Sequence, residues 1–161
     1  MKILVFDPSG AFEEGKGTTG WCLFKNRELI DVGQIRAEVH ETKFGYWQSH
    51  LTLIDDMKPD MCVIEDFRLH ADKVMNQVGS RMETPKIIGI IEFYLLKQEI
   101  PYEFQMAIEV KKHWKDEVLV DKGYITRNKG GRYFSVGIQV SDHVRDAVRH
   151  GAHYTTFKLK E

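Results

Sequence analysis

The sequence predicts an α/β domain built on a mixed sheet of about five strands flanked by helices. Two short apolar runs, residues 3–6 and 61–64, have the unbroken hydrophobicity of strands that are buried on both faces of a sheet. Beyond residue 57, strand-like and helical patterns alternate, which favours an α/β arrangement. Each apolar run ends on an acid, Asp7 or Glu65. Open α/β sheets keep their ligand sites at this carboxyl edge.

The first half of the chain is expected to contain three strands and one helix before the strand that ends at Glu65. Strands are predicted over residues 1–7, 21–24 and 29–35, with a Gly-rich loop at 8–20 and a tight hairpin turn at 25–28. Residues 41–57 have a helical pattern, because apolar side chains recur three to four positions apart. Pro59 stops this helix, and the strand over residues 61–66 follows.

The second half is expected to alternate between helices and strands. A helix is predicted over about 81–98, a strand over 102–106, a helix over 108–120 and a last helix from the N-cap residue Ser141 towards the carboxyl terminus. Residues 121–138 are rich in glycine and basic residues, which predicts an exposed flexible loop. We find no repeat and no linker, so residues 1–161 are expected to form a single domain.

The composition alone does not indicate a nucleic-acid binder. The 161 residues include 23 Lys and Arg against 24 Asp and Glu, although residues 109–132 carry a net charge of +3. Cys22 and Cys62 lie in apolar runs, which is typical of core cysteines in a reducing compartment. The amino terminus has the pattern of a strand rather than a signal peptide, and no apolar run reaches membrane-spanning length. We therefore expect a cytoplasmic protein without membrane contact.

Acids from separated segments are candidate ligands of a divalent cation. Asp7 and Glu65 end their strands, and residues 142–146 open the last helix with further acids and a histidine. Hard oxygen ligands that converge from three segments are typical of a divalent cation site and of metal-assisted chemistry. Asp66 is expected to face away from the site, because successive side chains of a strand point to opposite faces.

The last helix offers several candidate ligands. His143, Asp146 and His150 follow i, i+3, i+7 spacing and share a helix face. His150 lies one turn beyond the other two and is expected to be structural. Asp142 occupies the first helical turn, where the helix macrodipole stabilises a carboxylate, so a role at the helix end is the alternative to a role as a metal ligand. Whether Asp142 or His143 is the third ligand stays open.

Taken in order, these motifs resemble the RuvC-like Holliday junction resolvases of the ribonuclease H-like superfamily, including the phage-type members. Phe6-Asp7-Pro8-Ser9-Gly10, followed by Thr18-Thr19-Gly20-Trp21, is similar to the first-strand motif, in which an Asp precedes a Thr/Gly turn. Val63-Ile64-Glu65 is similar to the second acid motif, and residues 81–96 to the long helix after it. Asp142-His143-Val144-Arg145-Asp146-Ala147 resembles the closing motif. The family usually has two acids three residues apart here, and some members have His in place of the first.

The resemblance implies a metal-dependent endodeoxyribonuclease that resolves Holliday junctions and other branched DNA by phosphodiester hydrolysis. It assigns Asp7, Glu65, His143 and Asp146 as catalytic and metal-binding residues, with two Mg²⁺ ions per site and Mn²⁺ as a possible substitute. Family members cut two symmetric strands, which implies a homodimer, and the helix over residues 81–98 is the candidate interface. A phage origin would place the protein in the cytoplasm of the host cell.

Basic residues on both sides of the acids are candidate DNA contacts, because Lys and Arg neutralise backbone phosphates. Those after the Glu65 strand are Arg68, Lys73 and Arg81. Those in the net-positive segment are Lys111, Lys112, Lys122, Arg127, Lys129 and Arg132. An ordinary solvated helix face is the alternative interpretation of Lys111 and Lys112.

Two alternative functions stay open at this point. One is a nuclease of the same fold that acts on flaps, forks or packaging intermediates. The other is a non-catalytic DNA-binding relative, against which the intact set of acids argues. An actin-like kinase would share a similar first strand, but it needs a second domain of comparable size, and 161 residues do not provide one.

Overall fold

A five-stranded mixed sheet forms the centre of the computed structural model, which describes residues 1–68 and 81–160. The strand order is β3-β2-β1-β4-β5. The strands are β1 (Lys2–Asp7), β2 (Thr18–Lys25), β3 (Glu28–Arg36), β4 (Met61–Glu65) and β5 (Tyr102–Gln105). β1, β2 and β3 pair antiparallel, whereas β4 pairs parallel with both β1 and β5. The predicted α/β fold with a mixed sheet of about five strands is therefore confirmed.

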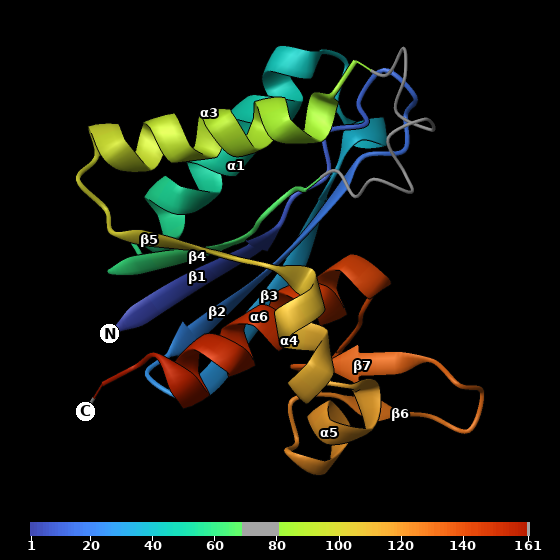
Figure 1. Ribbon diagram of the computed structural model, residues 1–161. Helices are drawn as coiled ribbons and strands as arrows, with labels where there is room; N and C mark the ends of the chain where they lie inside the picture. The colour runs from blue at the N-terminus through green and yellow to red at the C-terminus, as the bar shows by residue number, and fades with distance from the viewer. Residues whose placement is uncertain (69–80, 161) are drawn as a thin grey trace.

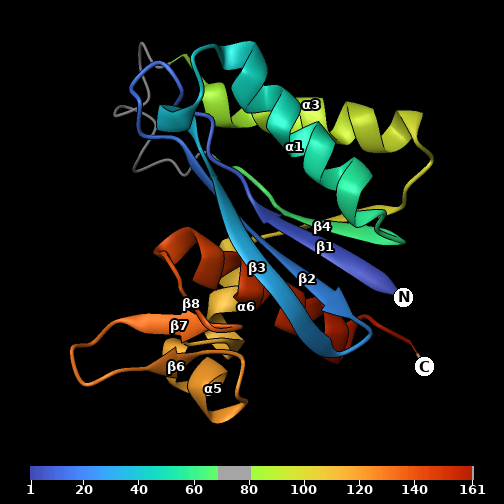
Figure 2. The ribbon, with the colours of Figure 1, turned by 180° about the vertical axis from the view of Figure 1, so that it is seen from behind.

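Helices cover both faces of this sheet (Figure 1). On one face lie α1 (Lys43–Met57) and α3 (Glu83–Lys97), and a short 3-10 helix, η1 (Ala37–Val39), precedes α1. On the other face lie α4 (Ala107–His113), α5 (Asp116–Asp121) and α6 (Asp142–Phe157). A small second sheet of β6 (Thr126–Arg127), β7 (Tyr133–Ser135) and β8 (Ile138–Gln139) packs beside α5 and α6, and the β6–β7 hairpin extends away from it (Figure 2).

The continuous apolar pattern of β1 follows from burial on both faces of the sheet. Ile3 and Val5 point into the core beneath α6, and Leu4 and Phe6 point into the core beneath α1 and α3. All four side chains are 0% exposed. A strand with two buried faces has no polar alternation, which is why the sequence shows an unbroken hydrophobic run.

The prediction of one helix over residues 108–120 is wrong. The chain forms α4 and then α5, with a break at Trp114 and Lys115. Trp114 has φ −119° and ψ 69°, outside the helical region, and its side chain is only 5% exposed in the core beneath α6. Lys115 is extended, and Asp116 and Glu117 follow in the first turn of α5, where acids favour a new helix start. Tertiary burial of the indole thus overrides the helical periodicity.

The prediction of a loop over residues 121–138 is also wrong in part, because β6, β7 and the start of β8 lie inside it. These strands are only two or three residues long, too short to show alternation in the sequence. Gly131 and Gly137 have φ values of +78° and +80°, so each lies in the left-handed region that tight turns require. β2 likewise begins at Thr18, three residues before the expected strand at 21–24.

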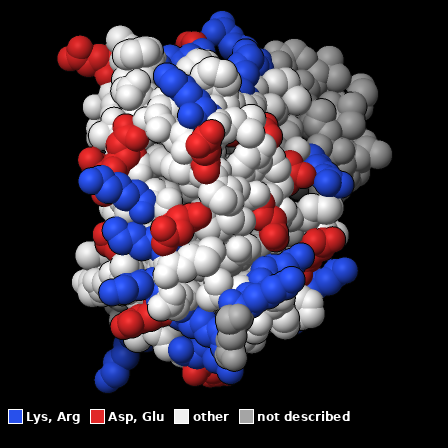
Figure 3. All heavy atoms as spheres, turned by 90° about the vertical axis from the view of Figure 1, so that its left-hand side faces the viewer, with Lys and Arg blue, Asp and Glu red and all other residues white. Residues whose placement is uncertain are grey.

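Charge is dispersed on the face of the molecule that carries both termini, where β1 begins (Figure 3). Acidic and basic side chains are interspersed there, in keeping with the near-neutral total charge. None of the helices in the described residues is long and apolar enough to cross a membrane.

Candidate active site

The first two acids of the candidate site end neighbouring parallel strands. Asp7 is the last residue of β1 and Glu65 is the last residue of β4. The register pairs Phe6 with Ile64, so the next residue on each strand emerges at the same edge of the sheet. Phe6 and Ile64 are completely buried. Each acid therefore stands on a rigid strand at the boundary between the core and the site.

The third acid, Asp146, comes from the first half of α6. The side-chain oxygen of Ser141 accepts a hydrogen bond from Val144 N–H, which caps the helix at the predicted residue. Apolar residues of α6 pack against β1 and β2, and Asp146 lies beside this buried face. One carboxylate oxygen from each of Asp7, Glu65 and Asp146 lies within 4.8 Å of the others. Three segments far apart in the sequence thus bring three carboxylates together.

Gly20 is the reason that α6 can approach the sheet so closely. It pairs with Asp7 across β1 and β2, and a Cβ atom there would lie 2.2 Å from the backbone carbon of His143. Such a distance is far below van der Waals contact, so only glycine allows this helix position. The side chain of His143 then reaches Asp7, with Nδ1 2.8 Å from Oδ2.

Gly20→Ala is expected to lower the free energy of unfolding by about 1–3 kcal/mol, because the clash involves backbone rather than a movable side chain. It is also expected to displace His143 from Asp7. Thermal denaturation measures the first effect, and chemical shifts of the His143 ring measure the second. Gly89→Ala is the control: a Cβ there meets nothing within 4 Å, so stability should rise by about 0.5–1 kcal/mol. Equal stability of the two variants would contradict this account of Gly20.

Burial and neighbouring acids disturb the ionisation of Asp7. Asp7 is 7% exposed, and desolvation raises the pKa of its carboxyl group to about 6. The hydrogen bond and charge of His143 oppose this rise, while the charges of Glu65 and Asp146 add to it. The bond to Asp7 in turn raises the pKa of the His143 imidazole. A cation bound beside these carboxylates would offset the repulsion between their negative charges.

His150, which the sequence analysis assigned a structural role, contacts Glu65 directly. Its Nε2 lies 2.8 Å from Glu65 Oε2, and its Nδ1 lies 3.0 Å from Oε1 of Gln105, the last residue of β5. A carboxylate only accepts hydrogen bonds, so Nε2 donates to Glu65. The ring is 1% exposed and fixes the orientation of the carboxylate. The shared helix face with Asp146 was the available signal, but only the fold shows that Glu65 lies opposite.

Two cations hold Asp146. Lys111 Nζ lies 3.0 Å from Oδ2, and the Arg149 guanidinium donates to Oδ1. Arg149 also donates to Asp116 and, at 2.9 Å, to the carbonyl of Trp114. These residues line an open cleft of about 430 Å³ between α4, α5 and α6. Lys111, a predicted DNA contact, is thus placed at an acid of the site.

Two acids adjacent to the proposed ligands lie outside the cluster. The Asp142 side chain is 87% exposed and pairs with Arg145. Asp66 pairs with Arg68, whose Nε lies 2.9 Å from its Oδ2. The structure thus brings together Asp7, Glu65 and Asp146, and it places His143 against Asp7.

The remaining predicted DNA contacts are spread over the surface. Arg127, Lys129 and Arg132 are exposed on the β6–β7 hairpin, and the guanidinium groups of Arg127 and Arg145 both lie over the Tyr133 ring, 5.4 and 4.1 Å from its centroid. Arg68, Arg81 and Lys112 are exposed as well, and Arg81 lies 3.4 Å from Glu13. Lys73 falls outside the described residues.

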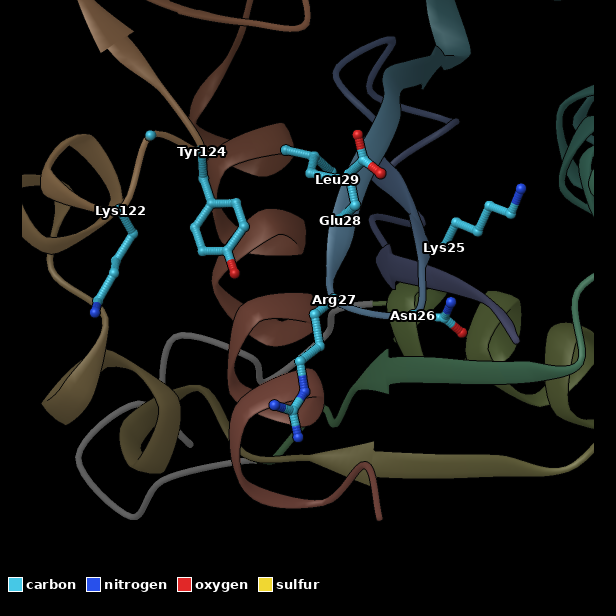
Figure 4. Close-up of a pocket in the computed structure, with 8 residues that line it drawn as sticks. Lys25, Asn26, Arg27, Glu28, Leu29, Lys122 and Tyr124 are labelled. Carbon is cyan, nitrogen blue, oxygen red and sulfur yellow. The ribbon is translucent and has the colours of Figure 1, made fainter. Parts of the chain in front are cut away.

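Lys122 lies apart from the hairpin tip, at the end of α5. It lines an open pocket of about 600 Å³ with the turn between β2 and β3, which contributes Lys25 and Arg27 (Figure 4). The ring of Tyr124 projects between Lys122 and that turn (Figure 4). Three basic side chains therefore line this edge, which lies at the amino end of β1 rather than at the edge that holds Asp7.

Comparison with known proteins places the fold among Holliday junction resolvases. No protein-family model matches the sequence, and no curated protein sequence matches it significantly. Thermus thermophilus RuvC in complex with Holliday junction substrate superimposes with a TM-score of 0.66 at 13% identity, over 98% of this chain and 94% of that one. A second Thermus thermophilus RuvC structure gives 0.61 at 14% identity, over 96% and 94%.

A viral enzyme shows the same likeness. Fowlpox virus resolvase in complex with substrate Holliday junction DNA superimposes with a TM-score of 0.59 at 12% identity, over 99% of this chain and 100% of that one. The structural similarity thus spans nearly the whole chain, although only 12–14% of the aligned residues are identical. This chain has the ribonuclease H-like fold in the form that RuvC-like Holliday junction resolvases share.

Proposed function

We propose that the protein is a metal-dependent, structure-selective endodeoxyribonuclease that resolves Holliday junctions and other branched DNA by phosphodiester hydrolysis. The observation that carries the proposal is the convergence of three carboxylates within 4.8 Å at the carboxyl edge of the sheet. Two of the structural relatives are complexes with Holliday junction DNA, which supports the same class of substrate. A relative that only binds DNA would not need three converging carboxylates, of which Asp7 is buried and Glu65 and Asp146 are half-buried.

The donor set fits hard divalent cations such as Mg²⁺, which prefer carboxylate oxygens. Asp7, Glu65 and Asp146 would hold the metal, and His143 would contribute a ligand beside Asp7. Burial is the main cause of the raised pKa of Asp7, and the charges of Glu65 and Asp146 add to it; a bound cation would offset both effects. When bound, a pair of divalent cations lowers the pKa of an attacking water and stabilises the negative charge on the leaving oxygen.

The residues around the acids orient them for this chemistry. His150 holds Glu65 against the end of β5, so the carboxylate cannot rotate freely. Lys111 and Arg149 hold Asp146 and add positive charge beside the acids, where the scissile phosphodiester would bind. Basic groups in this position attract the phosphate to a site that would otherwise repel it.

A cleavage assay tests the proposal. The substrates are a labelled four-way junction, a fork, a flap and a linear duplex of matched sequence, each with Mg²⁺, with Mn²⁺ or with EDTA. We expect paired, metal-dependent cuts near the branch point of the junction and no cuts in the duplex. Preferential cutting of flaps or forks would favour the alternative nuclease, and tight binding without cutting under any condition would favour a non-catalytic protein.

DNA binding should depend on the β6–β7 hairpin, which extends from the molecule with Arg127, Lys129 and Arg132 exposed. Replacing these three residues with Ala is expected to weaken binding and to reduce the slope of log K against log salt by about 0.9 for each lost phosphate contact. Fluorescence anisotropy with Ca²⁺ at several salt concentrations gives this slope.

Two further variants are compared with the hairpin variant: one tests a second basic surface, and the other is a control. Lys122→Ala tests separately the basic edge beside the β2–β3 turn, and it should reduce the slope by about 0.9 if Lys122 meets a phosphate. Lys158→Ala combined with Lys160→Ala is the control, since both lysines are exposed near the carboxyl terminus. An unchanged slope in the triple hairpin variant would refute the hairpin as a DNA contact.

Symmetric cutting of a junction requires two sites, and we propose a homodimer through the outer face of α3. Phe93 and Leu96 on this face are 68% and 60% exposed, an arrangement typical of an interaction surface. Phe93→Glu is expected to shift the protein to a monomer in light scattering after gel filtration. Phe44→Glu is the control, since Phe44 is a 75% exposed residue of α1. A wild-type monomer at micromolar concentration would contradict the dimer.

A further inference from the structure

A closed set of hydrogen bonds holds the peptide of Ser9, two residues after Asp7. Ser9 N–H donates to Thr19 Oγ1 at 3.1 Å, and the hydroxyl of Tyr46 donates to the Ser9 carbonyl at 2.5 Å. Thr19 belongs to β2 and Tyr46 to α1. Both backbone polar groups of Ser9 are therefore fixed by side chains from two different elements.

His50 connects the side chain of Thr19 to the backbone of Tyr46. Its Nδ1 lies 2.8 Å from the carbonyl oxygen of Tyr46, which only accepts, so Nδ1 carries a proton. Burial lowers the pKa of His50 to about 4, so the ring is neutral at physiological pH. Its Nε2, 2.8 Å from Thr19 Oγ1, therefore accepts the threonine hydroxyl proton. These four bonds link the residues Thr19, His50, Tyr46 and Ser9 in a ring, in which Tyr46 accepts through its backbone carbonyl and donates through its hydroxyl. The Tyr46 hydroxyl also lies 3.3 Å from Thr19 Oγ1.

The position of this ring connects it to the candidate site. Thr19, Tyr46 and His50 are all 0% exposed, on the side of the sheet that α1 covers. Thr19 precedes Gly20, which pairs with Asp7 and lies against the backbone of His143 on the opposite face. The segment that follows Asp7 is thus fixed from the α1 side, while Asp7 itself contacts α6 through His143.

A second contact secures the same segment. Gly10 N–H donates to Thr84 Oγ1 at 3.1 Å, and a Cβ on Gly10 would lie 2.1 Å from the backbone of Glu83. Residues 8–10 therefore have no freedom to shift towards α3. Among the described residues that hold this segment, Thr19, Tyr46 and His50 of the ring are fully buried polar side chains, whereas Thr84 is half-buried. Such a ring costs desolvation that an apolar cluster would avoid, which indicates a role in positioning.

We propose that Thr19, Tyr46 and His50 are positioning residues for Asp7: by fixing the Ser9 peptide, they set the direction in which the chain leaves β1 and hence the orientation of the Asp7 carboxylate. The inference rests on the proposed function, because it assumes that Asp7 binds a metal. Small displacements of such a group are costly, since a shift of about 1 Å can lower a rate by about 100-fold.

The test compares Thr19→Val with Thr19→Ser. Valine keeps the shape of threonine but removes the hydroxyl, whereas serine keeps the hydroxyl. Mn²⁺ binding is measured by calorimetry, and single-turnover junction cleavage is measured at saturating Mn²⁺. We expect Thr19→Val to weaken Mn²⁺ binding and to slow cleavage, each at least 10-fold, and Thr19→Ser to stay within about 3-fold of wild type. DNA affinity in Ca²⁺ should stay within about 2-fold of wild type in both variants.

The control for loss of a buried hydroxyl is Thr155→Val. Thr155 is 1% exposed on α6, and its Oγ1 donates to the carbonyl of Ala152 at 3.2 Å, away from Ser9. This variant should bind Mn²⁺ and cleave as wild type does, even if it melts at a lower temperature. An effect of Thr155→Val as large as that of Thr19→Val would overturn the proposal, because it would show a general loss of packing.

Tyr46→Phe keeps the proposal testable if Thr19→Val does not fold. Because Tyr46 and Thr19 act on the same peptide, the double variant should lose little more Mn²⁺ affinity than the worse single variant. Full additivity would overturn the ring as a unit, and so would wild-type Mn²⁺ affinity in both single variants. If the wild-type protein binds Mn²⁺ but cuts no branched DNA, the proposed function fails, and the Mn²⁺ affinities of the variants still decide the positioning role.

Discussion

Asp7→Asn is expected to abolish junction cleavage, by about 1,000-fold or more, while junction affinity in Ca²⁺ stays equal or increases. Asparagine keeps the size of the side chain but removes the charge that a metal needs at the centre of the acid cluster. Loss of one negative charge also lessens repulsion of the DNA phosphate. Single-turnover cleavage and anisotropy measure the two effects. Wild-type cleavage by this variant at physiological Mg²⁺ would refute the assignment of Asp7.

The same variant should gain stability without metal. Because burial raises the pKa of Asp7 to about 6, its ionisation at pH 8 destabilises the folded state relative to the unfolded chain. In EDTA at pH 8, Asp7→Asn is expected to be more stable than wild type by up to about 3 kcal/mol. The advantage should shrink as the pH falls through 6, where Asp7 becomes protonated in the folded state, and should vanish below 3.8, where the unfolded chain is protonated as well. Thermal melts over this pH range measure it.

Neighbouring acids provide matched comparisons for Asp7. Glu65→Gln should lose cleavage as Asp7→Asn does, because Glu65 belongs to the same cluster. Asp66→Asn should lose little, since Asp66 pairs with Arg68 outside the cluster. A larger loss of cleavage in Asp66→Asn than in Glu65→Gln would show that Asp66, and not Glu65, is the acid of the site at the end of β4.

His143→Ala is expected to lower cleavage by about 100-fold or more with either Mg²⁺ or Mn²⁺. The imidazole contacts Asp7 Oδ2 at 2.8 Å, so its removal frees the carboxylate and deletes the proposed ligand. Imidazole is a better ligand for transition metals than for Mg²⁺. Wild type should therefore cleave faster with Mn²⁺ than with Mg²⁺. His143→Asp restores a set of oxygen ligands and should shift the preference towards Mg²⁺. Cleavage rates across a titration of each metal give the ratio.

Asp142→Asn is the control for His143. Asp142 is exposed at the start of α6 and pairs with Arg145, so the variant should keep its metal preference. It should lose only about 0.3–1 kcal/mol of stability from the helix end. If Asp142→Asn abolished cleavage and His143→Ala did not, the third ligand would be Asp142, one position earlier in the helix.

The strands and the acids at their ends could be predicted because both signals are local. The run at residues 3–6 is buried on two faces, and a carboxylate at position 7 is therefore expected at the end of the strand rather than inside it. The start of α6 at Ser141 was equally local, since an N-cap residue contacts its own first turn. The break at Trp114 was not predictable from helical periodicity, because it depends on a core contact made by segments distant in sequence.

The contacts that orient the acids escaped prediction for the same reason. His150 meets Glu65 across 85 positions of sequence, and Thr19 meets His50 across 31. No spacing rule connects such pairs, because only the sheet topology brings their elements together. Gly20 was visible as part of a Thr/Gly motif, but the motif is the beginning of β2 rather than a turn. Its role follows from the approach of α6.

Each acid of the site already has a partner supplied by the protein itself. Asp7 is bonded to His143, Glu65 to His150, and Asp146 to Lys111 and Arg149. Such internal partners distinguish this site from small zinc domains, whose folding requires the metal. We therefore expect the protein to fold before the proposed metal binds. Chelation should yield a folded, inactive protein whose activity returns when a divalent ion is added.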